Sequence, residues 1–325
     1  MDVIQPNPPE QNLPDQRPPS ANLGLLHFVV MMVGVGCALL VSSAGDPAAL
    51  WGKSTGVFSQ RTNPHTTEVF SERDLDRRMP QEQAEILLER AVSRSDGATD
   101  QIDTRIEGWR GKLKWDSQLG DLTTVALNSD DQSVRASAVE VQLAAYGLAK
   151  NQSSVDALVR QADSRDHTQK IWALWTLGLL GNRGVATDRV VQVLAAHLED
   201  PGKNSDKDKD NDKDKDEDTR RWAVEGLALV GTTSTIAPLL EAMHNDPSAL
   251  VRERAACSLA ESGMLSHEQR LTAVPQLISY SEDAALDAQT RGWAFQVLTD
   301  ITKQHLPNDS AAWRNWYQTS VASGQ

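Results

Sequence analysis

The residues with the clearest spacing for chemistry are the carboxylates of an alternating lysine and aspartate run from 203 to 218. Counted from Asp206, Glu217 takes the twelfth place, and the spacing of these carboxylates resembles that of the ligands in a calcium-binding loop. Asn211 stands where such a loop needs glycine, and Lys213 stands where an apolar residue is usual. We therefore expect residues 202–218 to form a solvated low-complexity insertion, and a Ca²⁺-responsive loop over 203–218 is the alternative.

The histidines and cysteines give no pattern of a catalytic or metal site. None of the seven histidines is spaced from another as metal ligands are, and no His-Glu-x-x-His motif occurs. Cys257 lies in an apolar helical stretch, where a buried thiol is the usual state. We expect no catalytic residue, no metal and no cofactor, and therefore a protein that is not an enzyme.

The stretch from Gly52 to Thr55 looks like the end of a phosphate-binding loop. Such a loop needs a glycine five residues before its Gly-Lys pair, and Pro47 occupies that position. No strand pattern precedes it, so we do not interpret this stretch as a nucleotide site.

A repeated pattern organises the rest of the chain. A basic residue, an alanine three positions later and a leucine seven positions later share one side of a helix. A weaker copy has Gln142 in the leucine position. Between most of these helices lies a second apolar helical run, such as 236–243 or 274–278. The copies are Arg135/Ala138, Lys170/Ala173/Leu177, Arg220/Ala223/Leu227, Arg252/Ala255/Leu259 and Arg291/Ala294/Leu298.

Helix pairs that recur every 30 to 40 residues predict a solenoid, because one pair buries its apolar face only against its neighbours. We therefore expect an all-α fold: an α-solenoid of about five helix pairs, preceded by one transmembrane helix. Trp172, Trp222 and Trp293 each precede the alanine of a repeat. We expect these tryptophans to pack between repeats, and an exposed aromatic ladder is the alternative.

The repeats resemble a known family. The segments Asp130-x4-Arg135-x2-Ala138, Asp218-x-Arg220-x2-Ala223 and Val251-Arg252-x2-Ala255-Ala256 look like HEAT repeats, particularly the short bacterial HEAT-like kind. The resemblance covers roughly residues 117 to 301. It implies an α-solenoid that mainly binds other macromolecules, and it implies no reaction.

The region before the repeats divides by composition. Residues 1–22 are rich in Pro, Gln and Asn and are expected to be a disordered tail. Residues 23–43 contain an uncharged run long enough to cross a bilayer, and we predict a transmembrane helix there. A cleaved signal segment ending near Ala44 and a lipoprotein attached through Cys37 are the alternatives. Residues 44–78 are expected to be a flexible linker.

Two helical regions complete the predicted domain organisation. Helices are predicted from Pro80 to Val92 and from Ile102 to Leu113, so residues 79–116 are expected to cap the solenoid. Residues 117–325 are predicted to be the repeat domain, interrupted by the 202–218 insertion. The chain has 325 residues and a net charge of −13. This acidic balance argues against a nucleic-acid backbone as the principal partner.

The predicted function is that of a membrane-tethered, single-pass scaffold or adaptor that binds another protein. By analogy with the family, the partner would lie in a groove lined by the second helix of each pair. A bilin-lyase-like enzyme or enzyme partner is the alternative from another class, since some short HEAT-like repeats resemble those of bilin lyases. The residues proposed to contact the partner are Gln192, His197, Glu241, His244, Gln276 and Tyr280.

Overall fold

The computed structural model describes residues 72–199 and 210–322, and most of these residues are α-helical. The chain divides into two units. One spans residues 12–79, of which the structure describes only 72–79 with the short helix α1 (Glu72–Asp76). The other unit contains every described residue from Pro80 onward.

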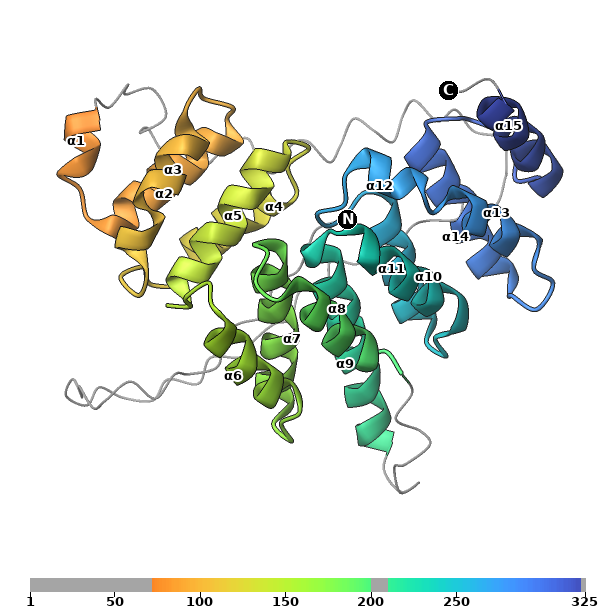
Figure 1. Cartoon of the computed structure of the whole chain (residues 1–325), viewed down its shortest axis with the longest axis horizontal. Coiled ribbons are helices and arrows are strands. Elements are labelled where there is room, and N and C mark those ends of the chain that lie inside the picture. Colours follow the sequence, from red (N-terminus) through yellow and green to blue (C-terminus); the bar gives the residue numbers. More distant parts are fainter. Residues whose placement is uncertain (1–71, 200–209, 323–325) are drawn as a thin grey trace, which may run out of the picture. The chain divides into compact units, whose positions relative to one another are not determined.

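The second unit is a succession of helices, and apart from the stretch between α8 and α9 they are joined by short loops (Figure 1). The described residues contain no strand, which agrees with the predicted all-α fold. The helices are α2 (Pro80–Val92), α3 (Ala98–Trp109), α4 (Ser117–Leu127), α5 (Gln132–Ala145), α6 (Gln152–Ala162), α7 (His167–Asn182), α8 (Thr187–Ala196), α9 (Asp210–Val230), α10 (Ile236–Asn245), α11 (Ala249–Ala260), α12 (His267–Leu271), α13 (Val274–Glu282), α14 (Ala288–Thr302) and α15 (Ser310–Ala322), with the 3-10 helix η3 (Thr233–Thr235) before α10.

Five pairs of helices repeat along this unit. The first helices of the pairs are α4, α6, α8, α10 and α13, and the second helices are α5, α7, α9, α11 and α14. Within each pair the two helices pack on each other, and each second helix contacts the next second helix. All five copies of the basic-alanine-leucine pattern lie on second helices. The helix pairs that the pattern predicts are therefore present.

Helices at both ends of the repeats pack on the neighbouring pair. The helix predicted from Pro80 to Val92 is α2, whereas the one predicted from Ile102 is α3 and begins four residues earlier, at Ala98. In the structure α2 packs on α4 and α3 packs on α5. At the other end, α15 packs on α13 and buries Trp313 completely.

The expected insertion is partly helical, which corrects the prediction. We expected a loop from 202 to 218 and a helix starting at Thr219, but α9 begins at Asp210. Acidic residues near a helix N-terminus interact favourably with the helix dipole, so low complexity does not prevent helix formation here. A helical conformation from 210 onward also does not provide the loop that the Ca²⁺ alternative needs. Residues 202–209 lie outside the described part.

The predicted membrane-spanning run is outside the described residues, as are the predicted tail and most of the predicted linker. Within the residues that the structure describes, every helix is too short or too polar to cross a bilayer.

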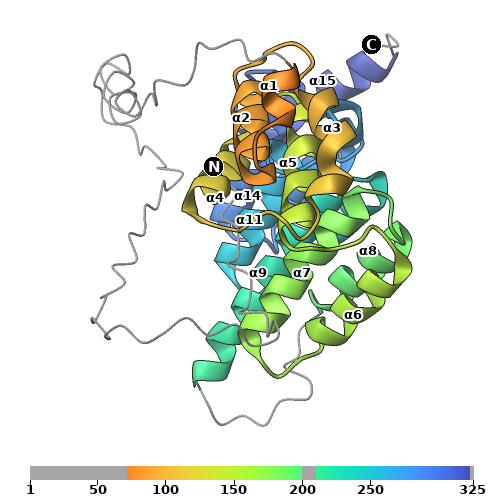
Figure 2. The same cartoon turned by 90° about the vertical axis from the view of Figure 1, so that its left-hand side faces the viewer.

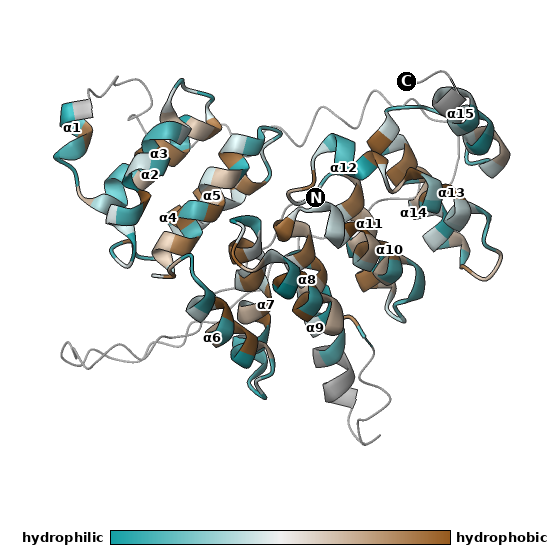
Figure 3. Cartoon of the chain, viewed as in Figure 1, coloured by the Kyte–Doolittle hydropathy of each residue, from teal (hydrophilic) through white to brown (hydrophobic). Residues whose placement is uncertain are grey.

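The centre of the repeat unit is formed by α7 and α9, which lie side by side in Figures 1 and 2. Every residue of α7 from Trp172 to Gly181 is buried, as is every residue of α9 from Trp222 to Val230. An apolar helix buried on all sides needs neighbours on all sides, and α7 contacts α5, α6, α8 and α9. Figure 3 shows hydrophobic residues on the helices, α7 among them, and hydrophilic residues on most loops.

The tryptophans before the repeat alanines are packed inside. Trp172, Trp222 and Trp293 expose 3%, 5% and 7% of their surface. The Trp222 ring meets Trp175 of α7 edge to face, with ring centroids 5.8 Å apart. The packing interpretation is therefore confirmed, and the exposed ladder is wrong.

Two glycines bring the main chains of α7 and α9 into direct contact. A Cβ atom on Gly178 would lie 2.5 Å from the main-chain oxygen of Gly226. A Cβ atom on Gly226 would lie 2.7 Å from the main-chain oxygen of Leu174. Neither distance is compatible with a side chain, so the close approach depends on glycine at both positions.

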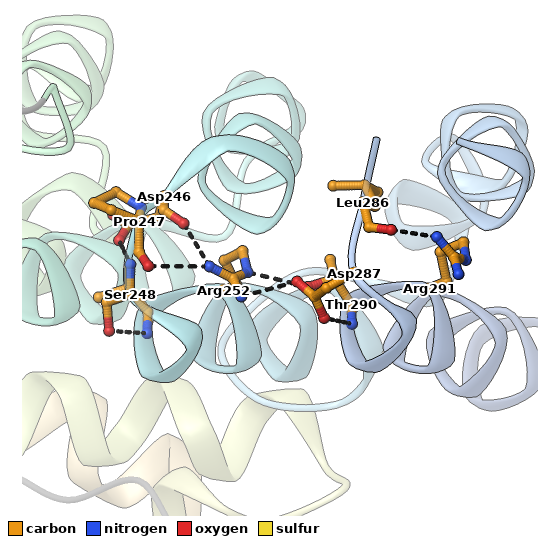
Figure 4. Close-up of polar contacts among 9 residues, drawn as sticks. Asp246, Pro247, Ser248, Arg252, Leu286, Asp287, Thr290 and Arg291 are labelled. Carbon is orange, nitrogen blue, oxygen red and sulfur yellow. Dashed lines mark hydrogen bonds and ion pairs between the residues drawn. The ribbon is translucent and has the colours of Figure 1, made fainter. Parts of the chain in front are cut away.

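In three of the five copies, the basic residue of the pattern binds the loop that precedes its own second helix. Arg252 donates to the main-chain oxygen of Asp246 at 2.8 Å and to the Asp287 carboxylate at 3.0 Å (Figure 4). Arg135 donates to the Ser129 oxygen at 2.7 Å in the same way, and Arg291 donates to that of Leu286. Asp287 in turn caps α14. One guanidinium thus joins its own loop to the next pair.

Arg270 has a related role at the end of α11. All five of its hydrogen bonds go to main-chain oxygens, those of Ser258, Leu259, Glu261, Ser262 and Leu265, at 2.8 to 3.2 Å. The last carbonyls of a helix have no partners within the helix, so this buried side chain satisfies them. Burial lowers the pKa of Arg270 to about 10, and the side chain therefore stays charged at neutral pH.

Gln142 departs from the pattern at a buried position. It takes the place that leucine fills in the other four copies, and its residue surface is 0% exposed. Neither atom of its amide group has a hydrogen-bond partner. A buried amide without partners costs free energy of folding, roughly 1–3 kcal/mol.

We expect Gly178→Ala to destabilise the protein by about 1–3 kcal/mol, because the new methyl group forces α7 and α9 apart. The matched control is Gly292→Ala in α14, where a Cβ atom meets nothing within 4 Å. Alanine favours a helix over glycine by up to about 1 kcal/mol, so this variant should be as stable as the wild type or more stable. Chemical denaturation of the three proteins measures both changes. Equal effects at the two sites would contradict the close contact.

We expect Gln142→Leu to stabilise the protein by roughly 1–3 kcal/mol, because it replaces an unsatisfied buried amide with an apolar side chain of similar size. The converse change, Leu227→Gln at the equivalent position of α9, should destabilise it by about 2 kcal/mol or more. Thermal melting of both variants tests this pair. A Gln142→Leu protein that melts below the wild type would show that the amide is satisfied in solution.

Candidate interaction surface

The six predicted contact residues lie on or beside the first helices of three successive pairs. Gln192 is on α8 and His197 follows its last residue, Glu241 and His244 are on α10, and Gln276 and Tyr280 are on α13. We predicted that second helices line the binding surface, and for these residues that assignment is wrong. The repeated pattern marks one helix of each pair, but it does not show which helix comes first.

Four of the six residues meet between α10 and α13. The rings of His244 and Tyr280 have centroids 4.5 Å apart, and His244 Nε2 lies 2.8 Å from the Asp283 carboxylate. Gln276 hydrogen-bonds Tyr280, and the charge of Glu241 acts on both Tyr280 and His244. We call Glu241, His244, Gln276, Tyr280 and Asp283 the His244 cluster.

Tyr280 is buried, which corrects its prediction as an exposed contact residue. Only 8% of its surface is exposed, and its hydroxyl donates to the main-chain oxygen of Leu240 at 3.3 Å. Burial and the charge of Glu241 raise the pKa of the Tyr280 phenol. Tyr280 therefore lies beneath the surface, whereas Glu241 and Gln276 are exposed on it.

The protonation equilibrium of His244 is set by its neighbours. Burial disfavours the charged ring, but hydrogen bonds to Asn245 and Asp283 and the charges of Asp283 and Glu241 outweigh it and raise the pKa of His244. The hydrogen bond to His244 lowers the pKa of Asp283. The cluster thus presents an imidazole and carboxylates that hold each other in place.

His197 and Gln192 lie one pair earlier, outside the cluster. The His197 ring contacts the main-chain oxygens of Val193 at 2.9 Å and Ala162 at 3.2 Å, so it joins α8 to the end of α6. Gln192 is exposed. Sequence reasoning missed Asp283 and Asp163, which face His244 and His197. Each is the residue directly after its helix, and no sequence pattern connects such a position with a histidine on another helix.

The arrangement is suited to polar recognition. Glu241, Asn245 and Gln276 offer exposed carboxylate and amide groups on neighbouring helices. Among the described residues, no three possible ligand side chains converge as a metal site requires.

The cationic side chains of the second half are bound internally. Residues 216–322 contain 14 Asp and Glu and 8 Lys and Arg. Each of the eight has a partner within the chain. Arg220 pairs with Asp246, Arg221 with Asp218, Arg252 with Asp287, Arg254 with Glu225, Lys303 with Glu261 and Arg314 with Glu282, while Arg270 and Arg291 bind main-chain oxygens. The surface of this half is left with an excess of carboxylates.

Comparison with known proteins agrees with the repeat geometry over part of the chain. No curated protein matches the sequence. Residues 212–301, which run from the start of α9 nearly to the end of α14, match the family of HEAT repeats. The predicted resemblance is therefore confirmed for this stretch, whose helix pairs are similar to HEAT repeats.

Proposed function

We propose that this protein is a non-enzymatic scaffold that binds another protein through the first helices α10 and α13. The observation that carries the proposal is the gathering of four predicted contact residues into the His244 cluster, inside the stretch that matches HEAT repeats. HEAT repeats typically mediate protein–protein interaction. We propose no catalytic step, because His197 and His244 are both engaged in contacts between helices.

The charge of the second half supports a partner with a basic surface. Every lysine and arginine between residues 216 and 322 has a partner within the chain, and only Lys303 and Arg314 are also exposed. Few cations are therefore left for phosphate groups. Nucleic-acid binding relies on lysine and arginine that reach the backbone phosphates. Unpaired carboxylates instead favour a cationic protein surface by charge complementarity.

The tether of this scaffold is part of the proposal. The 19 residues from Leu23 to Val41 carry no charge, and a helix of that length spans the hydrocarbon core of a bilayer. We propose that residues 23–43 anchor the chain as a single-pass membrane protein. Cleavage near Ala44, with export of the remainder, is the alternative.

The experiment uses Gln276→Arg, which places a cation on the exposed surface of the His244 cluster. We expect it to weaken binding of a basic partner at least tenfold, or by about 1.4 kcal/mol, through like-charge repulsion. The partner is captured by affinity purification of the intact chain from detergent-solubilised cells, identified by mass spectrometry, and titrated against purified variants.

Gln132→Arg is the matched control, since it makes the same chemical change at an exposed position of the second helix α5. It should bind the partner as the wild type does. Equal affinities of the three proteins would place the binding surface elsewhere. A captured ligand that proves to be nucleic acid would overturn the proposed partner class.

A further inference from the structure

Three histidines each lie against an aspartate of a neighbouring helix pair. His167, the first residue of α7, has its Nε2 atom 2.9 Å from the carboxylate of Asp218 in α9. His197 Nε2, at the end of α8, lies 3.7 Å from the carboxylate of Asp163, which follows α6. The third is His244 of α10, whose Nε2 lies 2.8 Å from the carboxylate of Asp283 after α13.

We propose that the third pair, His244 and Asp283, makes the cohesion between its two helix pairs depend on pH near neutrality. The contact is stronger when the imidazole ring is protonated and weaker when it is neutral. This property can be measured without the proposed partner.

The position of the His244–Asp283 pair makes its contribution to the interface large. The pair joins two first helices, which share fewer close contacts between pairs than second helices do. The side-chain bonds here include those of His244 with Asp283 and of the Tyr280 hydroxyl with the Leu240 oxygen. In a stack of repeats, stability is the sum of the intrinsic terms of the repeats and the terms of their interfaces. A change in these side-chain bonds therefore changes the interface terms directly.

The acceptors around His244 favour its protonated form. Asn245 donates its amide group to Glu241, so its amide oxygen faces His244 Nδ1, and the Asp283 carboxylate faces Nε2. Both ring nitrogens thus meet oxygen acceptors. A neutral imidazole carries one N–H group, and only the imidazolium donates to both. The other groups near this pair are Tyr280 and Arg291, whose charge acts on Asp283.

The other two histidines have different surroundings. The His197 Nδ1 atom faces the main-chain oxygen of Val193 and its Nε2 atom faces that of Ala162, with Asp163 as the nearby charge. At His167 the aspartate is shared, because Asp218 also pairs with Arg221 at 2.9 Å. Neither ring has a carboxylate to itself at hydrogen-bond distance.

The direction of the effect follows from the shifts at His244 and Asp283. The pKa of His244 is raised above its ordinary value of 6.5, so its stabilisation is complete below that value and is lost as pH rises through the folded pKa. The pKa of Asp283 is lowered from 3.8, so its contribution is complete above that value and is lost in stronger acid. The contribution of this pair is therefore greatest between these two ordinary values and falls as pH rises through the folded pKa of His244.

The test measures unfolding of the intact chain by denaturant at several pH values between 6 and 8. We expect the wild-type midpoint to fall across this range. In the His244→Gln variant, part of that fall should disappear. The control carries His267→Gln and His305→Gln, both at exposed positions, and should keep the wild-type dependence. Parallel curves for the wild type and His244→Gln would overturn the proposal.

A second measurement follows the ring of His244 by NMR in the unaltered protein, with its signal assigned by the single change His244→Gln. Its titration midpoint should lie above 6.5, the ordinary value for histidine. A midpoint at or below 6.5 would overturn the proposal as well.

Discussion

The contact between the main chains of α7 and α9 at Gly178 and Gly226 is the constraint on which the rest of the repeat unit depends. No Cβ atom separates the helices there, so the two main chains touch. Large side chains beside this contact, such as Trp175 and Trp222, pack against each other. Both helices are buried over nine or more consecutive residues. The other pairs pack outward from this buried centre. Arginine side chains bind either the loop before their own second helix or the loop of the next pair.

This way of building the stack also determines what remains for recognition. The arginines that hold loops and helix ends are bound to internal carbonyl and carboxylate groups. The surface of the second half of the chain therefore carries more carboxylates than cations. The exposed amide and carboxylate groups on α10 and α13 are positioned by the buried Tyr280 and by the His244–Asp283 pair. A polar surface with an excess of carboxylates is the consequence, and protein recognition is the use that we propose for it.

Much of the fold could be predicted from the sequence because the repeated pattern reports a local property, the apolar face of one helix. That pattern located all five second helices. Properties that depend on neighbours were not accessible. The buried Tyr280 ring packs against His244 of another helix, and α9 begins within an alternating charged run that has no apolar period. The order of helices within a pair is likewise set by packing, which no single helix encodes.

Hydrogen exchange of the intact protein under native conditions tests the central claim most directly, because exchange reports the local free energy of opening. If the contact between α7 and α9 organises the unit, the amides from Trp172 to Gly181 and from Trp222 to Val230 should exchange last. Protection should then decline toward α2 at one end and α15 at the other. Amides of α11 and α14 that outlast those of α7 and α9, or uniform protection along all the helices, would contradict the account.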